Sequence, residues 1–302
     1  METILLKVTA LVLIIVLSYA LKRYRFFKVE DFKVISNMVL KITLPCAVIS
    51  NFNRIDVNAS LFSLILIGAI CNVLTIGFGY LAALRKNKET RAFNMINYSG
   101  YNIGCFTMPY IQSFLSPSSV VATCLFDAGN SLFCTGATYS MAAAVAHTGE
   151  KSTTRLFFKR MFSSLPMDVY ILMVLFAWMQ IKLPYSVIAF TDIVGAANPF
   201  LAMVMIGIGF EFHTDRNKLL RIGGILLNRY LVAIVLAWLF YHYAPFDAEI
   251  RKLLALIAFA PVSAVCAIFT AKCKGDVAMS CTVNSLTVIL SVIFMTVLMI
   301  YL

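Results

Sequence analysis

Charged residues are scarce in this 302-residue sequence, because Asp, Glu, Lys and Arg together make up only 13% of it. A soluble domain usually carries about 25%. Several enzyme motifs are also missing: a zinc-binding His-Glu-x-x-His pair, a phosphate-binding P-loop and a Gly-x-Ser-x-Gly nucleophile turn. These absences argue against a soluble domain, an ATPase with its own nucleotide site and the hydrolases that use those motifs. The sequence predicts no enzyme.

Cysteine pairs with metal-ligand spacing are absent as well. Eight cysteines are present, but no two form a Cys-x-x-Cys pair, and nearly all lie in apolar runs. We interpret them as small packing residues rather than metal ligands or disulfides. The net charge of +11 does not predict nucleic-acid binding, because the basic residues lie in short loops between apolar runs and there face anionic lipid.

Most of the sequence consists of long apolar runs. The chain is 61% hydrophobic, with a mean hydropathy of +0.88. Runs of roughly 17–25 residues are long enough to cross a bilayer as helices. We therefore expect an all-α polytopic membrane protein with ten transmembrane helices, at about 4–21, 35–52, 60–84, 92–112, 119–146, 165–181, 186–210, 221–243, 250–271 and 277–302.

Lys and Arg are distributed unevenly among the loops. Eighteen fall in the odd-numbered loops and four in the even-numbered loops. The positive-inside rule places the odd-numbered loops in the cytoplasm and both termini outside a cytoplasmic membrane. The first basic cluster follows the first apolar run rather than preceding it, so we do not expect that run to be a cleaved signal peptide.

The longest basic loop divides the chain into two sets of five spans. We expect a first repeat at 1–146, a cytoplasmic linker at 147–164 and a second repeat at 165–302. Five spans per half force the halves into opposite orientations, as in the inverted repeats of secondary transporters. Sequence similarity between the two halves is weak, but it falls in corresponding segments. The tripeptide Asn-Ser-Leu occurs at 130–132 in the fifth segment and again at 284–286 in the tenth.

The stretch 98–109 contains residues that an uninterrupted membrane helix does not need. Gly100, Gly104 and Pro109 free backbone groups that lipid cannot satisfy. The stretch predicts a broken helix lining a site, or alternatively a kinked helix packed through small residues. Pro261 is the matching interruption in the ninth segment. Two half-helix N-termini at mid-membrane favour an anion, and the candidate substrate residues are Tyr101, Asn102, Ile103, Thr107, Pro261, Val262 and Ser263.

Asp127 is the acidic residue that lies well inside an apolar segment. A carboxylate at that depth is costly and points to binding of a proton or a cation, or to pairing with a basic residue. The alternatives are a structural hydrogen-bond acceptor and a shallower position near the outer interface. Asn130 and Asn284 are further candidates for ion coupling or for helix–helix hydrogen bonds. Arg229 is expected near a cytoplasmic helix end, with its charged group reaching the interface.

The run 102–109 resembles the Asn-x-x-x-x-Gly-x-Pro pattern in span four of the auxin efflux carrier family, which includes plant PIN-FORMED carriers and bacterial malate or malonate permeases. Pro261 and the run 269–272 are similar to that family's span nine. Tyr101 and Thr107 depart from the family's usual proline and glycine. The resemblance implies spans four and nine crossing at their breaks, an organic-anion substrate, an elevator-like motion and Asn102 close to the substrate.

The sequence therefore predicts a secondary carrier for a small organic anion such as a carboxylate. The rivals are a membrane anion sensor or interaction subunit, and a channel. No cofactor is expected; sodium, which binds at the crossover of the related bile-acid symporters, or a proton could be the coupling ion. The expected partners are membrane lipid and, by resemblance, a second copy of the chain.

Overall fold

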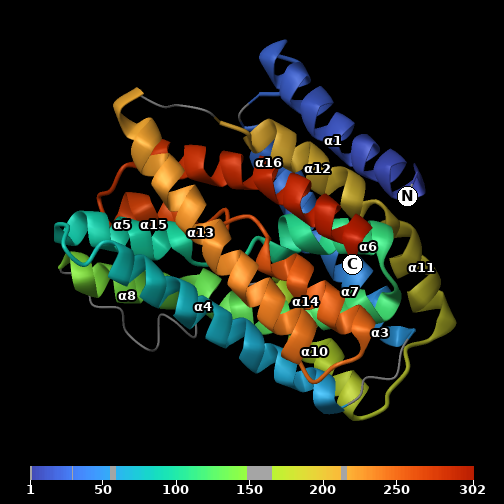
Figure 1. Ribbon diagram of the computed structural model, residues 1–302. Helices are drawn as coiled ribbons and strands as arrows, with labels where there is room; N and C mark the ends of the chain where they lie inside the picture. Colours follow the sequence, from blue (N-terminus) through green and yellow to red (C-terminus); the bar gives the residue numbers. More distant parts are fainter. Residues whose placement is uncertain (1, 29, 55–58, 148–164, 212–215) are drawn as a thin grey trace.

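The computed structural model describes residues 2–28, 30–54, 59–147, 165–211 and 216–302. Within these ranges all regular secondary structure is helical (Figure 1), so the all-α prediction is confirmed for the described part of the chain. The linker expected at 147–164 lies, apart from His147, outside the described residues. The division of the chain into two repeats around it stays a prediction.

The first half of the chain contains helices α1 (Glu2–Arg23), α2 (Asp31–Met38), α3 (Leu44–Asn53), α4 (Ser63–Ala82), α5 (Lys88–Tyr98), α6 (Met108–Phe114), α7 (Pro117–Leu132) and α8 (Thr138–Ala146). A short 3-10 helix, η2 (Ala59–Phe62), precedes α4, and π-helical turns η1 (Val39–Thr43), η3 (Ile103–Thr107) and η4 (Phe133–Ala137) join α2 to α3, lead into α6, and join α7 to α8. The second half contains α10 (Leu165–Trp178), α11 (Tyr185–Ala196), α12 (Asn198–Gly209), α13 (Arg216–Tyr243), α14 (Ala248–Ala258), α15 (Cys266–Lys272) and α16 (Val277–Tyr301).

Each of the ten apolar segments corresponds to a helix or to consecutive helices. Among the described residues, six helical segments are long and apolar enough to cross a membrane: Ile4–Arg23, Asp31–Asn53, Ser60–Ala82, Tyr185–Gly209, Lys218–Tyr243 and Val277–Tyr301. The others are shorter or interrupted, because α10 has 14 residues and the fourth and ninth segments each divide into two helices. Six candidate spans are thus found, and the count of ten stays a prediction.

The break in the fourth segment lies before Gly104 and Pro109, two of the three residues at which a break was expected. The chain leaves the helix after Tyr98 and resumes at Ile103, so Gly104 and Pro109 lie in η3 and in the first turn of α6. A proline ring clashes with the carbonyl four residues back in a regular helix. The wider turn of η3, in which Thr107 N donates to Asn102 O at 3.0 Å, precedes the proline and relaxes that constraint. Gly100 alone of the first-half candidates lies at the break itself.

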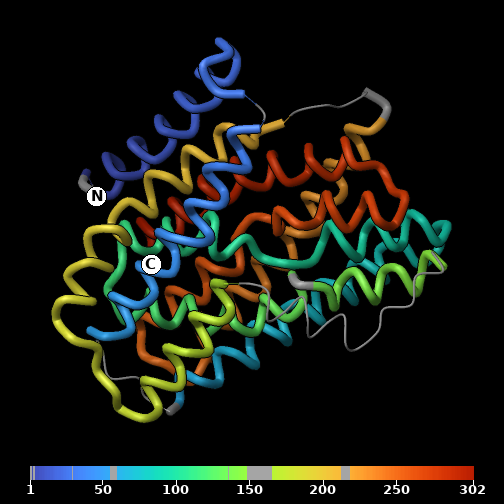
Figure 2. The backbone as a smooth tube through the Cα atoms, turned by 180° about the vertical axis from the view of Figure 1, so that it is seen from behind, coloured from blue at the N-terminus to red at the C-terminus, as the bar shows by residue number. Residues whose placement is uncertain are grey.

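The helices form two groups that pack mainly within themselves. Bundle A comprises α1, α2, α3, α10, α11 and α12, and bundle B comprises α4 to α8 and α13 to α16. Figures 1 and 2 show α1, α11 and α12 along one side of the molecule, away from α4, α5 and α8. Both interrupted segments, the fourth and the ninth, belong to bundle B.

Helices α4 and α7 approach each other closely because glycines face the contact. A Cβ at Gly129 would lie 1.9 Å from the carbonyl oxygen of Ile65, and one at Gly68 would lie 2.2 Å from that of Phe126. No side chain fits at either position. Small residues of this kind let membrane helices pack backbone to backbone, and here they bring polar side chains of α4 within reach of α7.

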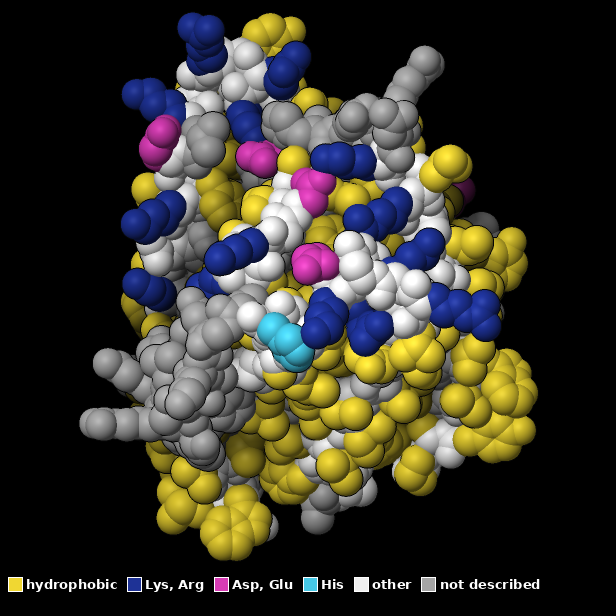
Figure 3. Space-filling view, turned by 90° about the vertical axis from the view of Figure 1, so that its left-hand side faces the viewer, with side chains coloured by type: hydrophobic (Ala, Val, Ile, Leu, Met, Phe, Trp, Pro, Cys, Tyr) yellow, Lys and Arg dark blue, Asp and Glu magenta, His cyan; other side chains and the backbone are white. Residues whose placement is uncertain are grey.

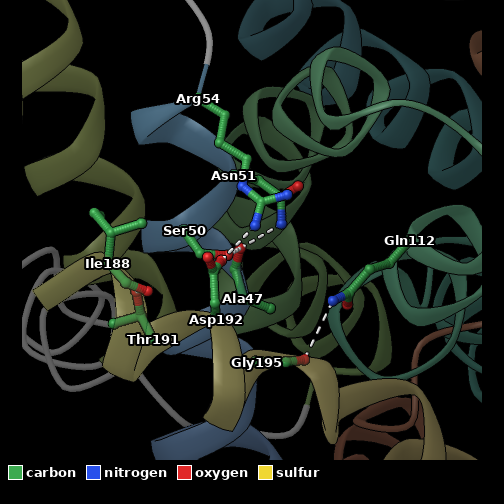
Figure 4. A network of polar contacts seen from close by, with 9 residues as sticks. All are labelled: Ala47, Ser50, Asn51, Arg54, Gln112, Ile188, Thr191, Asp192 and Gly195. Atoms are coloured by element: carbon green, nitrogen blue, oxygen red, sulfur yellow. Dashed lines mark hydrogen bonds and ion pairs between the residues drawn. The ribbon is translucent and has the colours of Figure 1, made fainter. Parts of the chain in front are cut away.

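Helices α3 and α11 pack at one end of bundle A, where Figure 4 shows a polar network. Arg54 pairs with Asp192 at 2.7 Å, and Gly195 lies so close that a Cβ there would be 2.8 Å from the backbone of Ala47. Gln112 of α6 donates to the carbonyl oxygen of Gly195 at 3.2 Å. This last bond links the helix that follows the first break to bundle A.

Basic side chains gather on the face where α4 ends and where α5, α13 and α16 begin (Figure 3). The exposed members include Arg85, Lys86, Lys88, Lys218, Lys272 and Lys274. Lys218 also pairs with Asp276 at 2.5 Å, and this hydrogen bond holds the pKa of the Asp276 carboxyl below its usual range. Both termini lie away from this face in Figure 1, and the orientation of the chain in a membrane stays a prediction.

Candidate functional site

The two broken helices meet at their breaks. The backbone N–H of Asn102 donates to the carbonyl oxygen of Pro261 at 2.9 Å. Gly100 adopts a φ of 75°, in the left-handed region that favours glycine. A Cβ at Gly100 would lie 3.0 Å from the Cβ of Ser263. Gly100 is therefore required both by its own conformation and by the approach of the second break. We call this meeting point the crossover.

Two asparagines satisfy the backbone freed at the first break. Asn130 of α7 donates to Tyr101 O at 2.9 Å and accepts from Tyr101 N at 3.1 Å. Asn72 of α4 accepts from Gly100 N and donates to the side-chain oxygen of Asn130, both at 3.1 Å. Backbone polar groups buried without partners would cost free energy at membrane depth. These amides replace the helical hydrogen bonds that the break removes.

Helix α16 supports the second break. The hydroxyl of Thr287 accepts from Val262 N at 3.2 Å and donates to the carbonyl oxygen of Asn284 at 2.8 Å. Pro261 has no N–H to satisfy. The first break is thus held by α7 and the second by α16, the helices that follow the two broken segments along the chain.

Arg229 does not lie near a helix end, contrary to the expectation from the sequence. It is midway along the 28-residue α13, because that helix begins at Arg216 rather than near residue 221. Its side chain is only 5% exposed. The guanidinium donates to the carbonyl oxygens of Tyr98, Gly100 and Ala260, so it contacts both breaks instead of reaching an interface.

Asp127 is buried beside the first break. Its carboxylate accepts from the Tyr170 hydroxyl of α10 and from the Asn130 side chain, both at 2.8 Å. A Cβ at Gly104 would lie 3.8 Å from the carboxylate. Within the described residues Asp127 has no cationic partner. The Tyr170 bond crosses from bundle A to bundle B, so this carboxylate also joins the two bundles.

The expected substrate residues surround the crossover but differ in access. Asn102 and Ser263 are each 8% exposed. Within the described residues the Asn102 side-chain amide has no hydrogen-bond partner, although its backbone oxygen accepts from the Thr107 hydroxyl at 3.1 Å. The remaining five candidates are enclosed by packing: Tyr101, Ile103, Thr107, Pro261 and Val262. Asn102 is therefore a candidate whose side-chain polar atoms remain available for a ligand.

The two repeated asparagines occupy different surroundings. Asn130 is 2% exposed and bonds to the first break, whereas Asn284 is half-buried. The side-chain oxygen of Asn284 is enclosed without a hydrogen-bond partner among the described residues. Asn130 contacts Asp127 directly, and the structure does not bring Asn284 into that cluster.

Four residues around the crossover were not expected from the sequence: Asn72, Tyr170 and Thr287, together with Arg229 in the position observed here. Asn72 is completely buried in the middle of an apolar helix. An amide at such a depth was the available signal, because it needs an internal partner. Tyr170 and Thr287 carry no comparable signal, since hydroxyl residues are common in membrane helices and their role depends on what packs beside them.

No cluster of three or more His, Cys, Asp or Glu residues that could hold a metal occurs in the described part of the chain. All eight cysteines have free thiols.

Comparison with known proteins identifies a family for this chain. Residues 3–155, which are half of the chain and include the first break and Asp127, match the family model described as membrane transport protein. A search of curated proteins finds no match. The family match, the apolar helices and the two broken helices agree with one another, and the chain belongs to the membrane transport protein family.

Proposed function

We propose that this transport protein is a secondary carrier that moves a small organic anion, such as a carboxylate, across the cytoplasmic membrane. One observation carries the proposal, namely the hydrogen bond from Asn102 N to Pro261 O, which joins two broken helices from different halves of the chain. Discontinuous helices that meet near the middle of the membrane are how many secondary carriers build substrate sites.

The crossover offers an anion polar groups other than the buried guanidinium of Arg229, whose donors are bonded to backbone carbonyl oxygens. The helix resumes at Ile103 after the first break and at Cys266 after the second. The N-terminal end of a helix carries a partial positive charge that favours an anion. The unpaired amide of Asn102 lies immediately before the first of these ends. A carboxylate is the substrate group that this arrangement accommodates best.

The arrangement of the bundles supports an elevator-like motion within ten spans related as inverted repeats. Bundle B contains both breaks and the supporting residues Asn72, Asn130 and Thr287, whereas bundle A contains neither break. Polar contacts between the bundles include Gln112 to Gly195, Asn198 to Gln112 and Tyr170 to Asp127, and these would have to be exchanged during the motion. In this proposal bundle B carries the substrate past bundle A, with both termini outside.

Asp127 is the proposed coupling residue. Its carboxylate is buried and bonds only to neutral groups among the described residues. An ionised carboxylate in such a place is costly unless it binds a proton or a cation. Its position beside Gly104 would let the charge state of Asp127 affect anion binding at the crossover.

Uptake of a panel of labelled dicarboxylates into proteoliposomes, with and without a sodium or proton gradient, tests this function. Saturable uptake that accelerates when unlabelled substrate is loaded on the far side is expected of a carrier. Asn102→Ala should abolish it. Asn94→Ala is the matched control, because Asn94 lies on the same broken helix, is also 8% exposed and its side-chain oxygen has no described partner.

The same measurements distinguish the alternatives. Uptake without saturation or counterflow would indicate a channel. Binding of an anion to folded protein without any flux would indicate a sensor. Equal loss of uptake in both variants would show that the effect of Asn102→Ala is not specific, and it would argue against the crossover as the substrate-binding site.

A further inference from the structure

One guanidinium lies where the two broken helices expose their carbonyl groups. Arg229 donates through Nη1 to Tyr98 O, and through Nη2 to Gly100 O and to Ala260 O at 3.0 Å each. A single nitrogen therefore joins the first break to the second. The guanidinium carbon also lies 5.5 Å from the centre of the Tyr101 ring, at a distance typical of a cation–π contact.

The charge of Arg229 is balanced without a carboxylate. Within the described residues Arg229 forms no ion pair. Tyr98 is the last residue of α5, and Ala260 follows the end of α14. Each helix C-terminus carries a charge of about −0.5, so two of them together supply about −1. This value matches the single positive charge of a guanidinium that is only 5% exposed.

In secondary carriers with broken helices, exposed carbonyls and half-helix C-terminal ends are the groups that coordinate a transported sodium ion. Here those groups already hold a cation that belongs to the protein. We propose that Arg229 is the resident cation of the crossover, which replaces a sodium ion there, so that assembly of the crossover does not require sodium.

The proposal deepens the function proposed above, because it identifies which ion the crossover does not need for its assembly. It also makes Arg229 a positioning residue. The guanidinium holds the C-terminal ends of α5 and α14 together, while Asn102 remains free to contact a substrate. A permanent charge at this point keeps the two breaks aligned whether or not substrate is bound.

Thermal unfolding of the purified protein, in sodium chloride and in choline chloride of equal ionic strength, tests the proposal. The wild type should unfold at the same temperature in both salts. Arg229→Ala should unfold about 5 °C or more below the wild type, since three buried carbonyls lose their donor. Millimolar methylguanidinium or sodium should restore part of that loss, and choline should not. Arg221→Ala is the matched control, because Arg221 lies on the same helix but is exposed.

A second pair of variants keeps the test decisive if Arg229→Ala does not fold. Arg229→Lys retains the charge, whereas Arg229→Met retains only the length of the side chain. The lysine variant should unfold at the higher temperature. Equal unfolding temperatures for the two would overturn the proposal, as would a sodium-specific rise in the wild type or a folded Arg229→Ala that neither cation restores. No substrate enters these measurements, so their failure is distinct from failure of the anion-carrier function.

Discussion

Replacing Asn130 by alanine should destabilise the protein far more than the same change at Asn284. The two residues begin the same Asn-Ser-Leu sequence, one in each half of the chain. Asn130 donates to Tyr101 O and accepts from Tyr101 N. The side-chain oxygen of Asn284 is enclosed and accepts no hydrogen bond among the described residues.

The magnitude follows from the number of groups that lose partners. Among the described residues, Asn130→Ala leaves two buried groups without a partner, namely the backbone N–H of Tyr101 and one carboxylate oxygen of Asp127, whereas the carbonyl oxygen of Tyr101 still accepts from Ile103 N. Each buried unsatisfied group costs about 1–3 kcal/mol, so the free energy of unfolding should fall by roughly 2–6 kcal/mol. Asn284→Ala removes a side-chain oxygen that accepts no hydrogen bond among the described residues. The free energy of unfolding should therefore change by no more than about 1 kcal/mol.

Unfolding of both variants in the same detergent or bicelle would measure the difference. At about 2–4 °C per kcal/mol for a chain of this order of size, Asn130→Ala should lower the midpoint by roughly 10 °C. Asn284→Ala should leave it within a few degrees of the wild type. Similar losses in both variants would refute the reasoning, because they would show that hydrogen bonds to the first break do not set the stability of this region.

Three further predictions concern packing, the contact between bundles and pH. Gly129→Ala should prevent folding or sharply reduce the yield of folded protein, because its Cβ would lie 1.9 Å from a backbone oxygen of α4, whereas Gly77→Ala, with no atom within 4 Å of its Cβ, should fold normally. Tyr170→Phe should lower the free energy of unfolding by about 1–3 kcal/mol, and a double-mutant cycle with Asp127→Asn should show that the two effects are not additive. Asp276→Asn should destabilise the protein slightly at neutral pH. Because the pKa of Asp276 is held below 3.8, its contribution is present above about pH 4 and disappears as the pH falls through the lowered value. In a series of unfolding midpoints measured at different pH values, the difference between Asp276→Asn and the wild type should therefore vanish in acid. A difference that grew in acid would contradict the assignment.

Much of the fold could be predicted from the sequence. Apolar runs of membrane-crossing length, separated by short basic loops, indicate an all-helical membrane protein, and helices occur where those runs lie. The interruptions in the fourth and ninth segments could also be placed, because glycine, proline and asparagine within an apolar run are visible without knowledge of neighbours. Local composition carries this information, since helix formation in a membrane depends mainly on the segment itself.

The exact break could not be placed in the same way. Gly100, Gly104 and Pro109 were equally plausible, and only Gly100 lies at the break. The chain leaves the helix at the position where Ser263 of the other half approaches within contact of its backbone. Glycine is required there by a neighbour 163 positions away along the chain, and no local pattern contains that information.

The sequence by itself determined that this is a helical membrane protein with two interrupted segments and a buried acid at Asp127, because length, hydropathy and composition are properties of each segment alone. Only the tertiary structure decided which groups satisfy the interruptions. It placed Arg229 against both breaks and Asn130 against one of them, and it left the side-chain oxygen of the counterpart Asn284 without a hydrogen bond among the described residues. Freed backbone groups in a membrane must find partners within the protein, and which partner each finds depends on which helices pack together.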